Sequence, residues 1–426
     1  MRVLVIGSGG REHALVYALT RSPSVRQVDC APGNGGIGRL ARLVPIAAVD
    51  LDGLVEHAAR ERYDLVVVGP EAPLCAGLAD RLVARQVPVF GCSAAAAAIE
   101  GSKDFAKRLM VAAGVPTARF ATFAEPAPAW RFAEELAASG PVVVKADGLA
   151  AGKGVVIAAG AVEARQAITS FLDGTTVGAA GGRVVVEELL VGREASCMAL
   201  VDGEVVLPLP ACEDHKTIGE GDRGPMTGGM GAISPTPVVS DALLAQVTRE
   251  VLEPTARQLV AMGRPFRGLL YAGLMITAGG PRVLEFNCRF GDPETQPLLL
   301  RCRGDLAAAL HGVATGQPRP LDFDDGAACC VVLAAAGYPG VVEKGAPIHG
   351  LDEAAALEGV VLFHGGTRRQ GDGFVTDGGR VLGVTAGGPD LGTARQRAYA
   401  AVARIRFDGM QLRRDIGARG MSPGAR

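Results

Sequence analysis

The sequence lacks the features that mark several large classes of protein. Its net charge is only −2, so it has no excess of positive charge for nucleic acid or an anionic membrane. No apolar stretch approaches the roughly 18 residues of a membrane span, and the N-terminal apolar run is too short for a signal peptide. We therefore expect small-molecule partners and neither nucleic acid nor membrane.

Paired cysteines are also missing. The chain has nine cysteines, but none stands in a Cys-x-x-Cys pair, and Cys329 and Cys330 lie inside an apolar run typical of a buried strand. The sequence thus predicts no zinc site and no disulfide framework. A reducing compartment, the cytoplasm, fits this cysteine usage best.

A complete P-loop is absent, although residues 142–158 come close to one. Gly148 and Gly152-Lys153 stand one residue too close together, and Gly154 occupies the position of the required Ser or Thr. Strand-like valines follow where a helix should begin. The segment is predicted to be a β-hairpin with a glycine-rich loop, either an ordinary turn or a flap that covers phosphates.

The 426 residues are enough for about three domains, and the composition is that of a globular protein. Residues 1–100 alternate short apolar runs with helical patterns, which predicts a doubly wound parallel sheet. Ligands of such sheets lie beyond the carboxyl ends of the strands. Two polar, glycine-bearing segments occupy such places, residues 7–13 and residues 69–73, and the second contains Glu71.

The first of these turns partly matches a dinucleotide-binding fingerprint. Gly7 and Gly9 fit its first two glycines, and Asp29 stands where a ribose-binding acid would be. Glu12, however, replaces the third glycine, and Arg11 opens the helix. This favours a single phosphate held by backbone N–H groups and a guanidinium, although a turn without a ligand remains an alternative.

Further along the chain, residues 120–190 are predicted to form a small α+β unit with the glycine-rich hairpin at its edge. Residues 210–237 are predicted to be a long loop, and residues 294–312 a single helix. Residues 240–262 should form a helix with a kink at Pro254. A last module should begin after Pro320.

The segment around residue 285 has the composition of a magnesium site. Glu285 and Asn287 are two apart on a predicted strand, so they share a face, and their oxygens are ligands that Mg²⁺ accepts. Arg289 would continue this face and could clamp an anion. An ordinary solvated strand face has the same spacing and remains the alternative.

Other polar groups carry weaker signals. Glu187, Glu188 and Glu194 could bind the amino and hydroxyl groups of an adenosine, or could form an acidic surface turn. His215, between Asp214 and Lys216, could be a general base or simply solvated. No nucleophile motif such as Gly-x-Ser-x-Gly occurs.

Taken together, the motifs resemble those of the ATP-grasp superfamily and, within it, the phosphoribosylamine–glycine ligase family. The resemblance covers essentially the whole chain and is carried by VLVIGSGGREHAL, VGPEAPL, IEGSKDFAK, VVKADGLAAGKGV, EDHK, TGGMGAISP, LYAGLM, EFNCRFGDPETQ, FHGGT and RRDIG. It implies a multidomain α/β and α+β fold, with a Rossmann-like domain over 1–101 and an ATP-grasp core over 102–120 and 193–322. A lid subdomain over 121–192 and a small C-terminal α+β domain over 323–426 would complete it.

The resemblance also implies an activity, the ATP-dependent joining of glycine to 5-phosphoribosylamine in purine biosynthesis, with Mg²⁺ or Mn²⁺ and a monomeric enzyme. The catalytic residues would be Lys145 and Arg289, and the metal ligands Glu285 and Asn287. The ATP-binding residues would be Lys103, Lys145, Gly148, Gly152, Lys153, Gly154, Glu187, Glu188, Leu190 and Glu194. The substrate-binding residues would be Gly9, Gly10, Arg11, Glu71, Asp214, Lys216, Arg289 and Asp292.

The chain departs from the family pattern at two positions. Met226 replaces an asparagine and Ile233 a tyrosine, so a substrate role for either is in doubt. Residues 271–275 offer no further carboxylate, so we expect only two protein ligands for the metal. The alternatives are another ATP-grasp ligase, a nicotinamide-dependent oxidoreductase built on the first sheet, and a catalytically silent binder.

Overall fold

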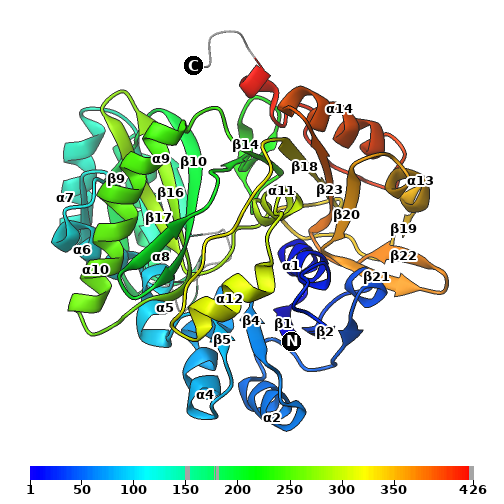
Figure 1. Cartoon of the computed structure of the whole chain (residues 1–426). Coiled ribbons are helices and arrows are strands. Elements are labelled where there is room, and N and C mark those ends of the chain that lie inside the picture. Colours follow the sequence, from blue (N-terminus) through cyan, green and yellow to red (C-terminus); the bar gives the residue numbers. More distant parts are fainter. Residues whose placement is uncertain (149–153, 177, 179–181, 422–426) are drawn as a thin grey trace.

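The computed structural model describes residues 1–148, 154–176, 178 and 182–421. Its N-terminal part is a five-stranded parallel sheet in the order β3-β2-β1-β4-β5, as the alternating pattern predicted (Figure 1). The strands are β1 (Arg2–Gly7), β2 (Gln27–Pro32), β3 (Arg42–Leu43), β4 (Leu65–Val68) and β5 (Val89–Phe90). The helices are α1 (Gly10–Thr20), η1 (Ile37–Arg39), α2 (Leu51–Glu61), α3 (Glu71–Cys75), α4 (Leu78–Ala84) and α5 (Ala94–Gly101).

A second sheet, which we call the lid sheet, has four antiparallel strands in the order β6-β9-β7-β8. These are β6 (Phe120–Phe123), β7 (Val142–Ala146), β8 (Val155–Ala158) and β9 (Val184–Glu188). Helices α7 (Pro126–Ala137) and α8 (Ala161–Leu172) pack on it and bury a separate small core. The predicted hairpin is present, since β7 pairs with β8.

A third sheet, the central sheet, has the antiparallel order β11-β10-β16-β17. Its strands are β10 (Arg193–Asp202), β11 (Val205–Pro208), β16 (Arg267–Thr277) and β17 (Gly280–Asn287). Helix α6 (Lys103–Ala113) lies between the N-terminal part and this sheet. Ser102 caps the start of α6 by accepting the Phe105 N–H, and Gly114 ends it in the left-handed conformation, as expected of a glycine C-cap.

The C-terminal part is built around a five-stranded sheet in the order β12-β15-β18-β23-β20. Its members are β12 (Glu213–Asp214), β15 (Gly231–Ser234), β18 (Ala327–Ala334), β20 (Val360–His364) and β23 (Arg380–Gly388). Around it lie β19 (Pro347–Ile348), β21 (Thr367–Gln370), β22 (Gly373–Thr376), α13 (Leu351–Ala355), α14 (Leu391–Val402) and η4 (Ala418–Met421).

Two predictions of secondary structure were wrong. Residues 210–237 are not a loop, because they form β12, β13 (Thr217–Gly219), β14 (Arg223–Met226) and β15. Two of these strands complete the C-terminal sheet, and partners so distant in sequence leave no local signal. Residues 294–312 form two helices, α11 (Thr295–Leu300) and α12 (Leu306–Ala314), because Asp305 caps a new helix by accepting the Ala308 N–H at 3.0 Å.

The helical run between β15 and β16 is irregular where its proline lies. It consists of α9 (Asp241–Val247), a π-helical turn η3 (Thr248–Leu252) and α10 (Glu253–Ala261). Pro254 stands in the first turn of α10, directly after the π turn, where its missing N–H is tolerated. The predicted irregularity is therefore found as a π turn.

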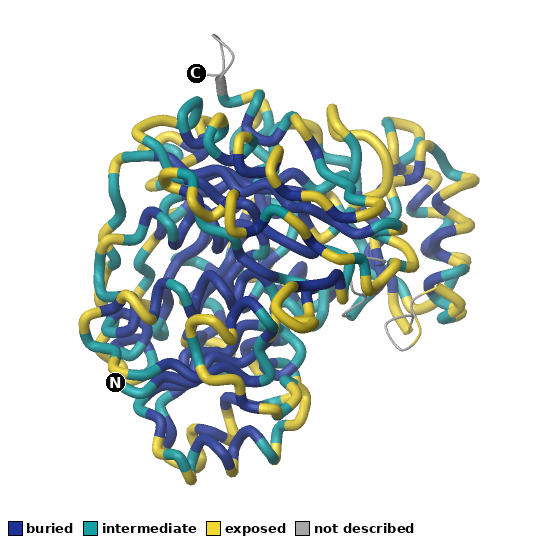
Figure 2. Tube along the Cα trace, turned by 90° about the vertical axis from the view of Figure 1, so that its right-hand side faces the viewer, coloured by how far each residue is buried: buried dark blue, intermediate teal, exposed yellow. Residues whose placement is uncertain are grey.

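Buried segments, dark blue in Figure 2, follow the strands of the sheets, whereas exposed segments lie mainly on the outer turns and helix faces. In the described part of the chain, no helix combines the length and apolar character needed to cross a membrane.

Candidate active site

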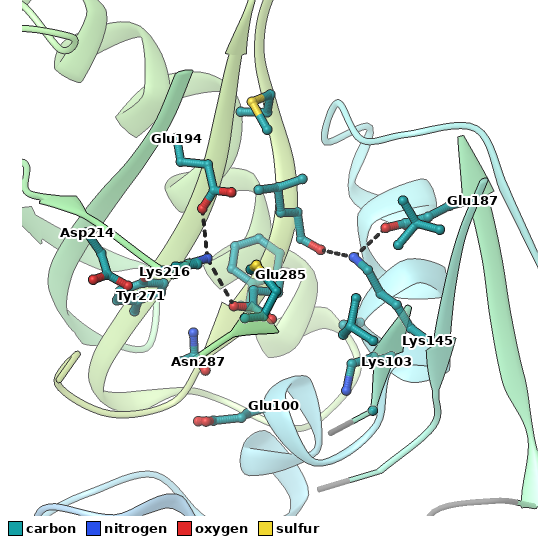
Figure 3. A pocket seen from close by; sticks show the side chains of 18 of the residues that line it. Glu100, Lys103, Lys145, Glu187, Glu194, Asp214, Lys216, Tyr271, Glu285 and Asn287 are labelled. Atoms are coloured by element: carbon teal, nitrogen blue, oxygen red, sulfur yellow. Dashed lines mark hydrogen bonds and ion pairs between the residues drawn. The ribbon is translucent and has the colours of Figure 1, made fainter. Parts of the chain in front are cut away.

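A cavity of about 380 Å³, which we call the main cavity because it holds most of the predicted site residues, lies between the lid sheet and the central sheet (Figure 3). It is lined by most of the residues singled out in the sequence: Glu71, Lys103, Lys145, Gly148, Gly154, Glu187, Glu188, Leu190, Glu194, Asp214, Lys216, Glu285, Asn287, Arg289 and Asp292. Gly152 and Lys153 lie outside the described residues. Residues that lie up to 221 positions apart in the sequence thus line the same cavity.

A cluster of buried charges forms one side of the cavity. Lys145 of β7 and Glu187 of β9 lie on the same face of the lid sheet, since Val143 pairs with Glu187, and their side chains form an ion pair. Lys107 of α6 binds the same carboxylate, with Nζ 2.5 Å from Oε2. Burial would raise the pKa of Glu187, but Lys145 and Lys107 more than offset it and hold that pKa below its usual range. Because two lysines share one carboxylate, this cluster brings a net positive charge to the cavity.

A bulge in β17 gives Lys145 a second partner. Gly273 pairs with Glu285 but Leu274 pairs with Val283, so Leu284 is the extra residue in the ladder. Its carbonyl oxygen accepts a hydrogen bond from Lys145 Nζ at 3.1 Å. Lys145 thereby ties the lid sheet to the central sheet across the cavity.

Lys103 is the first residue of helix α6. Its Nζ donates to the Gly148 carbonyl oxygen at 3.3 Å, just before the segment that is not described. Burial lowers the pKa of Lys103, and Glu285 partly opposes this. The preceding Ser102 donates its hydroxyl to Asp147 at 2.9 Å, so the helix start and the hairpin are held together.

A second lysine–carboxylate cluster faces the first. Lys216 Nζ lies 3.0 Å from Glu194 Oε2 and 3.8 Å from Glu285 Oε1 (Figure 3). Beside it, Asp214 Oδ1 is buried and has no hydrogen-bond partner among the described residues. Burial and the nearby Glu294 carboxylate raise the pKa of Asp214 well above its usual range. A cation placed here would relieve both effects.

Glu285 and Asn287 project from β17 into the cavity and offer two oxygen ligands, as the alternation predicted. About 41% of the Glu285 side chain is exposed, so its carboxylate can reach a bound ion. No group of three or more His, Cys, Asp or Glu side chains suited to a metal occurs in the described residues. The donor set therefore fits a hard ion such as Mg²⁺ whose remaining ligands come from phosphate and water.

Arg289 is held by acceptors on every side. Its guanidinium lies 3.2 Å from Glu71 and 2.8 Å from Glu100, and it donates to Asn287 Oδ1 at 3.2 Å. Glu71, which was predicted to bind substrate, therefore contacts Arg289 directly. The arrangement fixes the guanidinium beside both oxygen ligands of β17.

A smaller cavity of about 240 Å³ lies between the N-terminal sheet and the C-terminal part. It is lined by Ser8, Gly9, Gly10, Asp292, Gln296, Val332, Gly365, Gly366, Gly379, Arg380, Leu382 and Gly383. Asp292 lines both cavities, and Arg380 Nη2 lies 3.1 Å from its Oδ2. Gln296 donates to Asp292 Oδ1 at 2.8 Å, while its own Oε1 is buried without a partner in the described part of the chain.

The first glycine turn does not offer the anion site predicted from Arg11. The Glu12 carboxylate accepts the Gly9 N–H at 2.6 Å and also binds Arg11 Nε at 2.5 Å. Both predicted donors are therefore used inside the protein. Gly9 and Gly10 line the smaller cavity, whereas Arg11 does not. Asp29, the expected ribose-binding acid, is fully buried and bound by Arg42 and by the Tyr63 hydroxyl, which argues against a nicotinamide site.

Sequence reasoning missed several residues of these cavities, including Glu100, Lys107, Tyr271, Gln296 and Arg380. One available signal was the scarcity of lysine, since the chain has six lysines against 37 arginines. Four of the six, Lys103, Lys107, Lys145 and Lys216, line the main cavity. In such an arginine-rich chain, every lysine is a candidate for a specific role.

Two buried histidines, His13 and His364, predict a pH dependence of stability. Burial and the neighbouring His364 lower the pKa of His13 to about 3, and burial with Arg39 lowers the pKa of His364 to about 4. Below about pH 6.5 the unfolded chain takes up protons that the folded protein excludes, so the free energy of unfolding falls by about 1.4 kcal/mol per pH unit per histidine. From pH 7 to pH 5 we expect a loss of about 2 kcal/mol for each.

Urea titrations at pH 7, 6 and 5 measure this loss. Asn can accept the hydrogen bond that His13 Nδ1 accepts from the His364 N–H, so His13→Asn should remove about half of the pH-dependent loss. His349→Asn, at an exposed position, is the matched control and should leave the slope unchanged. An unchanged slope in His13→Asn would contradict the assignment.

Three family models match the chain. They are the N domain of phosphoribosylglycinamide synthetase over residues 1–100, its ATP-grasp (A) domain over 101–295 and its C domain over 328–419. The chain is 48% identical to a phosphoribosylamine–glycine ligase of Mesorhizobium japonicum, covering 98% of both chains, and 50% identical to that of Allochromatium vinosum, covering 99% of both.

Solved structures show the same similarity. The phosphoribosylamine–glycine ligase of Thermotoga maritima superposes with a TM-score of 0.85 at 35% identity, covering 98% of this chain and 100% of that one. The biotin carboxylase domain of a Hydrogenobacter thermophilus carboxylase, solved with MgADP, shares only the fold, with a TM-score of 0.74 at 16% identity over 96% and 91% of the two chains. The predicted family and fold class are confirmed.

Proposed function

The chain belongs to the phosphoribosylglycinamide synthetase family, and on this premise we propose that its two cavities together join glycine to 5-phosphoribosylamine at the expense of ATP. The observation that carries the proposal is the position of Asp292, which lines both cavities. The main cavity would hold ATP and glycine, and the smaller cavity the sugar phosphate. Their shared wall is where an acyl group could pass from one substrate to the other.

The chemistry takes place in two steps. A glycine carboxylate oxygen attacks the γ-phosphorus of ATP, ADP leaves, and glycyl phosphate forms. The amine of phosphoribosylamine then attacks the carbonyl carbon, the bond to phosphate breaks, and the amine loses a proton. Neither step needs a protein nucleophile, so positioning and charge neutralisation supply the catalysis.

We assign the ATP phosphates to Lys103 and Lys145, with Gly148 and Gly154 of the same cavity and, on the sequence pattern alone, Gly152 and Lys153. Glu187 would orient Lys145 and Lys107 rather than contact adenosine, because both lysines bind its carboxylate. Glu188, Leu190 and Glu194 would bind the base and ribose. The adenine ring would pack on the apolar lining, formed by Ile99, Met110, Val143, Ile157, Leu189, Met275, Leu284 and Phe286.

Glu285 and Asn287 would hold Mg²⁺, which supplies charge neutralisation of the ATP phosphates when bound. Mn²⁺ has similar ligand preferences and is the proposed substitute. Arg289, fixed by Glu71 and Glu100, would contact the transferred phosphoryl group. These roles agree with the net positive charge that the lysines bring to the opposite wall.

Asp214 and Lys216 would bind glycine, the lysine through the carboxylate and Asp214 through the ammonium group. Asp214 Oδ1 is buried without a partner among the described residues, and an ammonium group would supply one. We expect Asp214→Asn to raise the KM for glycine by about tenfold, the order of one lost charge-assisted hydrogen bond, with a smaller change in the KM for ATP. Initial rates of ADP release against glycine concentration measure this, with the exposed Asp372→Asn as control. An equal rise in both KM values would contradict the assignment.

A steady-state ADP assay with each substrate omitted in turn tests the function. Turnover should require ATP, glycine and phosphoribosylamine together, and the product should contain both glycine and the sugar phosphate. Turnover without glycine, or with another acid or amine from a panel, would indicate a different ATP-grasp ligase. An absence of ADP release with all three substrates would indicate a silent binder.

We further propose a monomeric enzyme of the cytoplasm. All nine cysteines are free thiols, which suits a reducing compartment.

A further inference from the structure

Asn34, in the loop after β2, makes hydrogen bonds with both ends of its side-chain amide. Its Nδ2 donates to the Ser8 carbonyl oxygen at 2.8 Å and to the His364 carbonyl oxygen at 2.7 Å. Its Oδ1 accepts the N–H groups of Gly36 and Ile37, both at 2.9 Å. Only 9% of Asn34 is exposed, so water does not compete freely for these bonds.

These contacts join two turns, at Ser8 and at His364, that lie 356 residues apart in the sequence. Ser8 begins the glycine turn after β1, and His364 ends β20 and precedes Gly365 and Gly366. The peptide groups around His364 are held twice, because its N–H donates to His13 Nδ1 at 2.8 Å while its carbonyl oxygen binds Asn34. Asn34 thus links the N-terminal sheet to the C-terminal sheet by hydrogen bonds.

Both turns line the smaller cavity through backbone rather than side chains. A Cβ on Gly10 would lie 2.7 Å from Gln296 Nε2, so a side chain there would displace the Gln296 amide. A Cβ on Gly366 would lie 2.5 Å from the Gly378 Cα. The N–H groups of Gly365 and Gly366 donate to backbone carbonyl oxygens of β23, so this turn shapes the cavity by the position of its backbone, and Asn34 holds that backbone against the first turn.

We propose that Asn34 is a positioning residue that sets the spacing between the two glycine turns and so determines the affinity for the sugar-phosphate substrate. The inference rests on the proposed function, because it assigns the smaller cavity to phosphoribosylamine. A substrate held between two backbone turns contacts both of them only at the right spacing, and a displacement of about 1 Å at such a site can cost roughly a hundredfold in rate. Asn34 itself touches no reacting atom.

The side-chain amide of Asn34 is the group that this link between the sheets requires. It carries a donor for two carbonyl oxygens and an acceptor for two N–H groups at one end of a short side chain. Aspartate would keep the acceptor but place a negative charge against the carbonyl oxygens of Ser8 and His364. Alanine would remove all of these contacts.

Steady-state kinetics and direct binding test the proposal. Asn34→Ala should raise the KM for phosphoribosylamine and the Kd for ribose 5-phosphate, measured by calorimetry, about tenfold, the equivalent of about 1.4 kcal/mol. Asn34→Asp should raise both at least as far. The KM values for ATP and glycine should stay within about twofold, because the main cavity contains none of these contacts.

Gln411→Ala is the matched control. Gln411 Nε2 also joins backbone carbonyl oxygens, of Ala335 at 2.7 Å and Tyr338 at 3.2 Å, but lines neither cavity. It should lower thermal stability without a selective rise in the KM for phosphoribosylamine. Should Asn34→Ala fail to fold, Asn34→Ser, which keeps an acceptor oxygen, should give the same selective rise.

An unchanged KM for phosphoribosylamine in folded Asn34 variants, or a uniform change in all three KM values like that of Gln411→Ala, would overturn the proposal. Failure of the proposed function is distinguishable, since the unmodified protein would then show no turnover that depends on glycine and phosphoribosylamine.

Discussion

Replacing Lys145 with alanine is expected to lower kcat/KM for ATP by about 10² to 10³, the cost of removing one fixed donor from a site of developing charge. Lys145 is the residue that binds Glu187 of the lid sheet and the Leu284 carbonyl of the central sheet. Its loss would remove the proposed phosphate contact and also the hydrogen bond between the two sheets. Initial rates of ADP release at varied ATP concentration measure the effect.

The control for Lys145→Ala is Lys344→Ala. Lys344 is 58% exposed and pairs with Asp377 in the C-terminal part, so its loss should change kcat/KM less than twofold, as is usual for a surface ion pair. Circular dichroism should show that Lys145→Ala is folded, because Lys107 still pairs with the buried Glu187 carboxylate. Normal turnover in Lys145→Ala would overturn the assignment of the ATP phosphates.

Replacing Glu285 with glutamine is expected to lower kcat by at least about 10² and to raise the concentration of Mg²⁺ needed for half-maximal rate at least tenfold. The substitution keeps the size of the side chain and one oxygen but removes the charge. Burial would raise the pKa of Glu285, but Lys216, Lys145, Lys103 and Arg289 together hold it below its usual range, so the group is an anion at neutral pH. A neutral amide would leave these cations and the metal with one negative charge fewer.

Titration of the ADP-release rate with Mg²⁺ and then with Mn²⁺ measures this change. Glu253→Gln is the matched control, because Glu253 pairs with Arg257 on the outer surface of α10, with 37% of its side chain exposed. It should leave the metal dependence unchanged. If Glu285→Gln kept the Mg²⁺ dependence of the unmodified protein, Glu285 would not be a ligand.

Local patterns in the sequence were sufficient for much of the fold. Alternation of short apolar runs with helical stretches predicted the parallel sheet, and the strand-like runs on both sides of a glycine-rich loop predicted the hairpin of β7 and β8. These features depend on residues within a few positions of one another, so no distant contact was needed. The failures, at residues 210–237 and 294–312, occurred where a partner strand or a capping residue redirected the chain.

The same limit applies to the site. The spacing of Glu285 and Asn287 predicted that they share a face, and the departures from the P-loop rule predicted a hairpin instead of a helix, which the pairing of β7 with β8 confirms. No local pattern could bring Lys107 to the Glu187 carboxylate, because the pair depends on how α6 packs against the lid sheet. Arg380 likewise reaches Asp292 only because the start of β23 lies beside the loop that follows β17.

The sequence by itself determined the family, the strand and turn pattern and the residue types that ATP chemistry requires, because each is written within short segments. The tertiary structure decided that Lys107 and Lys145 share one buried carboxylate, that Asp292 belongs to two cavities and that Asn34 joins turns more than 300 residues apart. The reason is physical: hydrogen bonds and ion pairs form over about 3 Å, and only packing of the sheets brings such distant residues within that range.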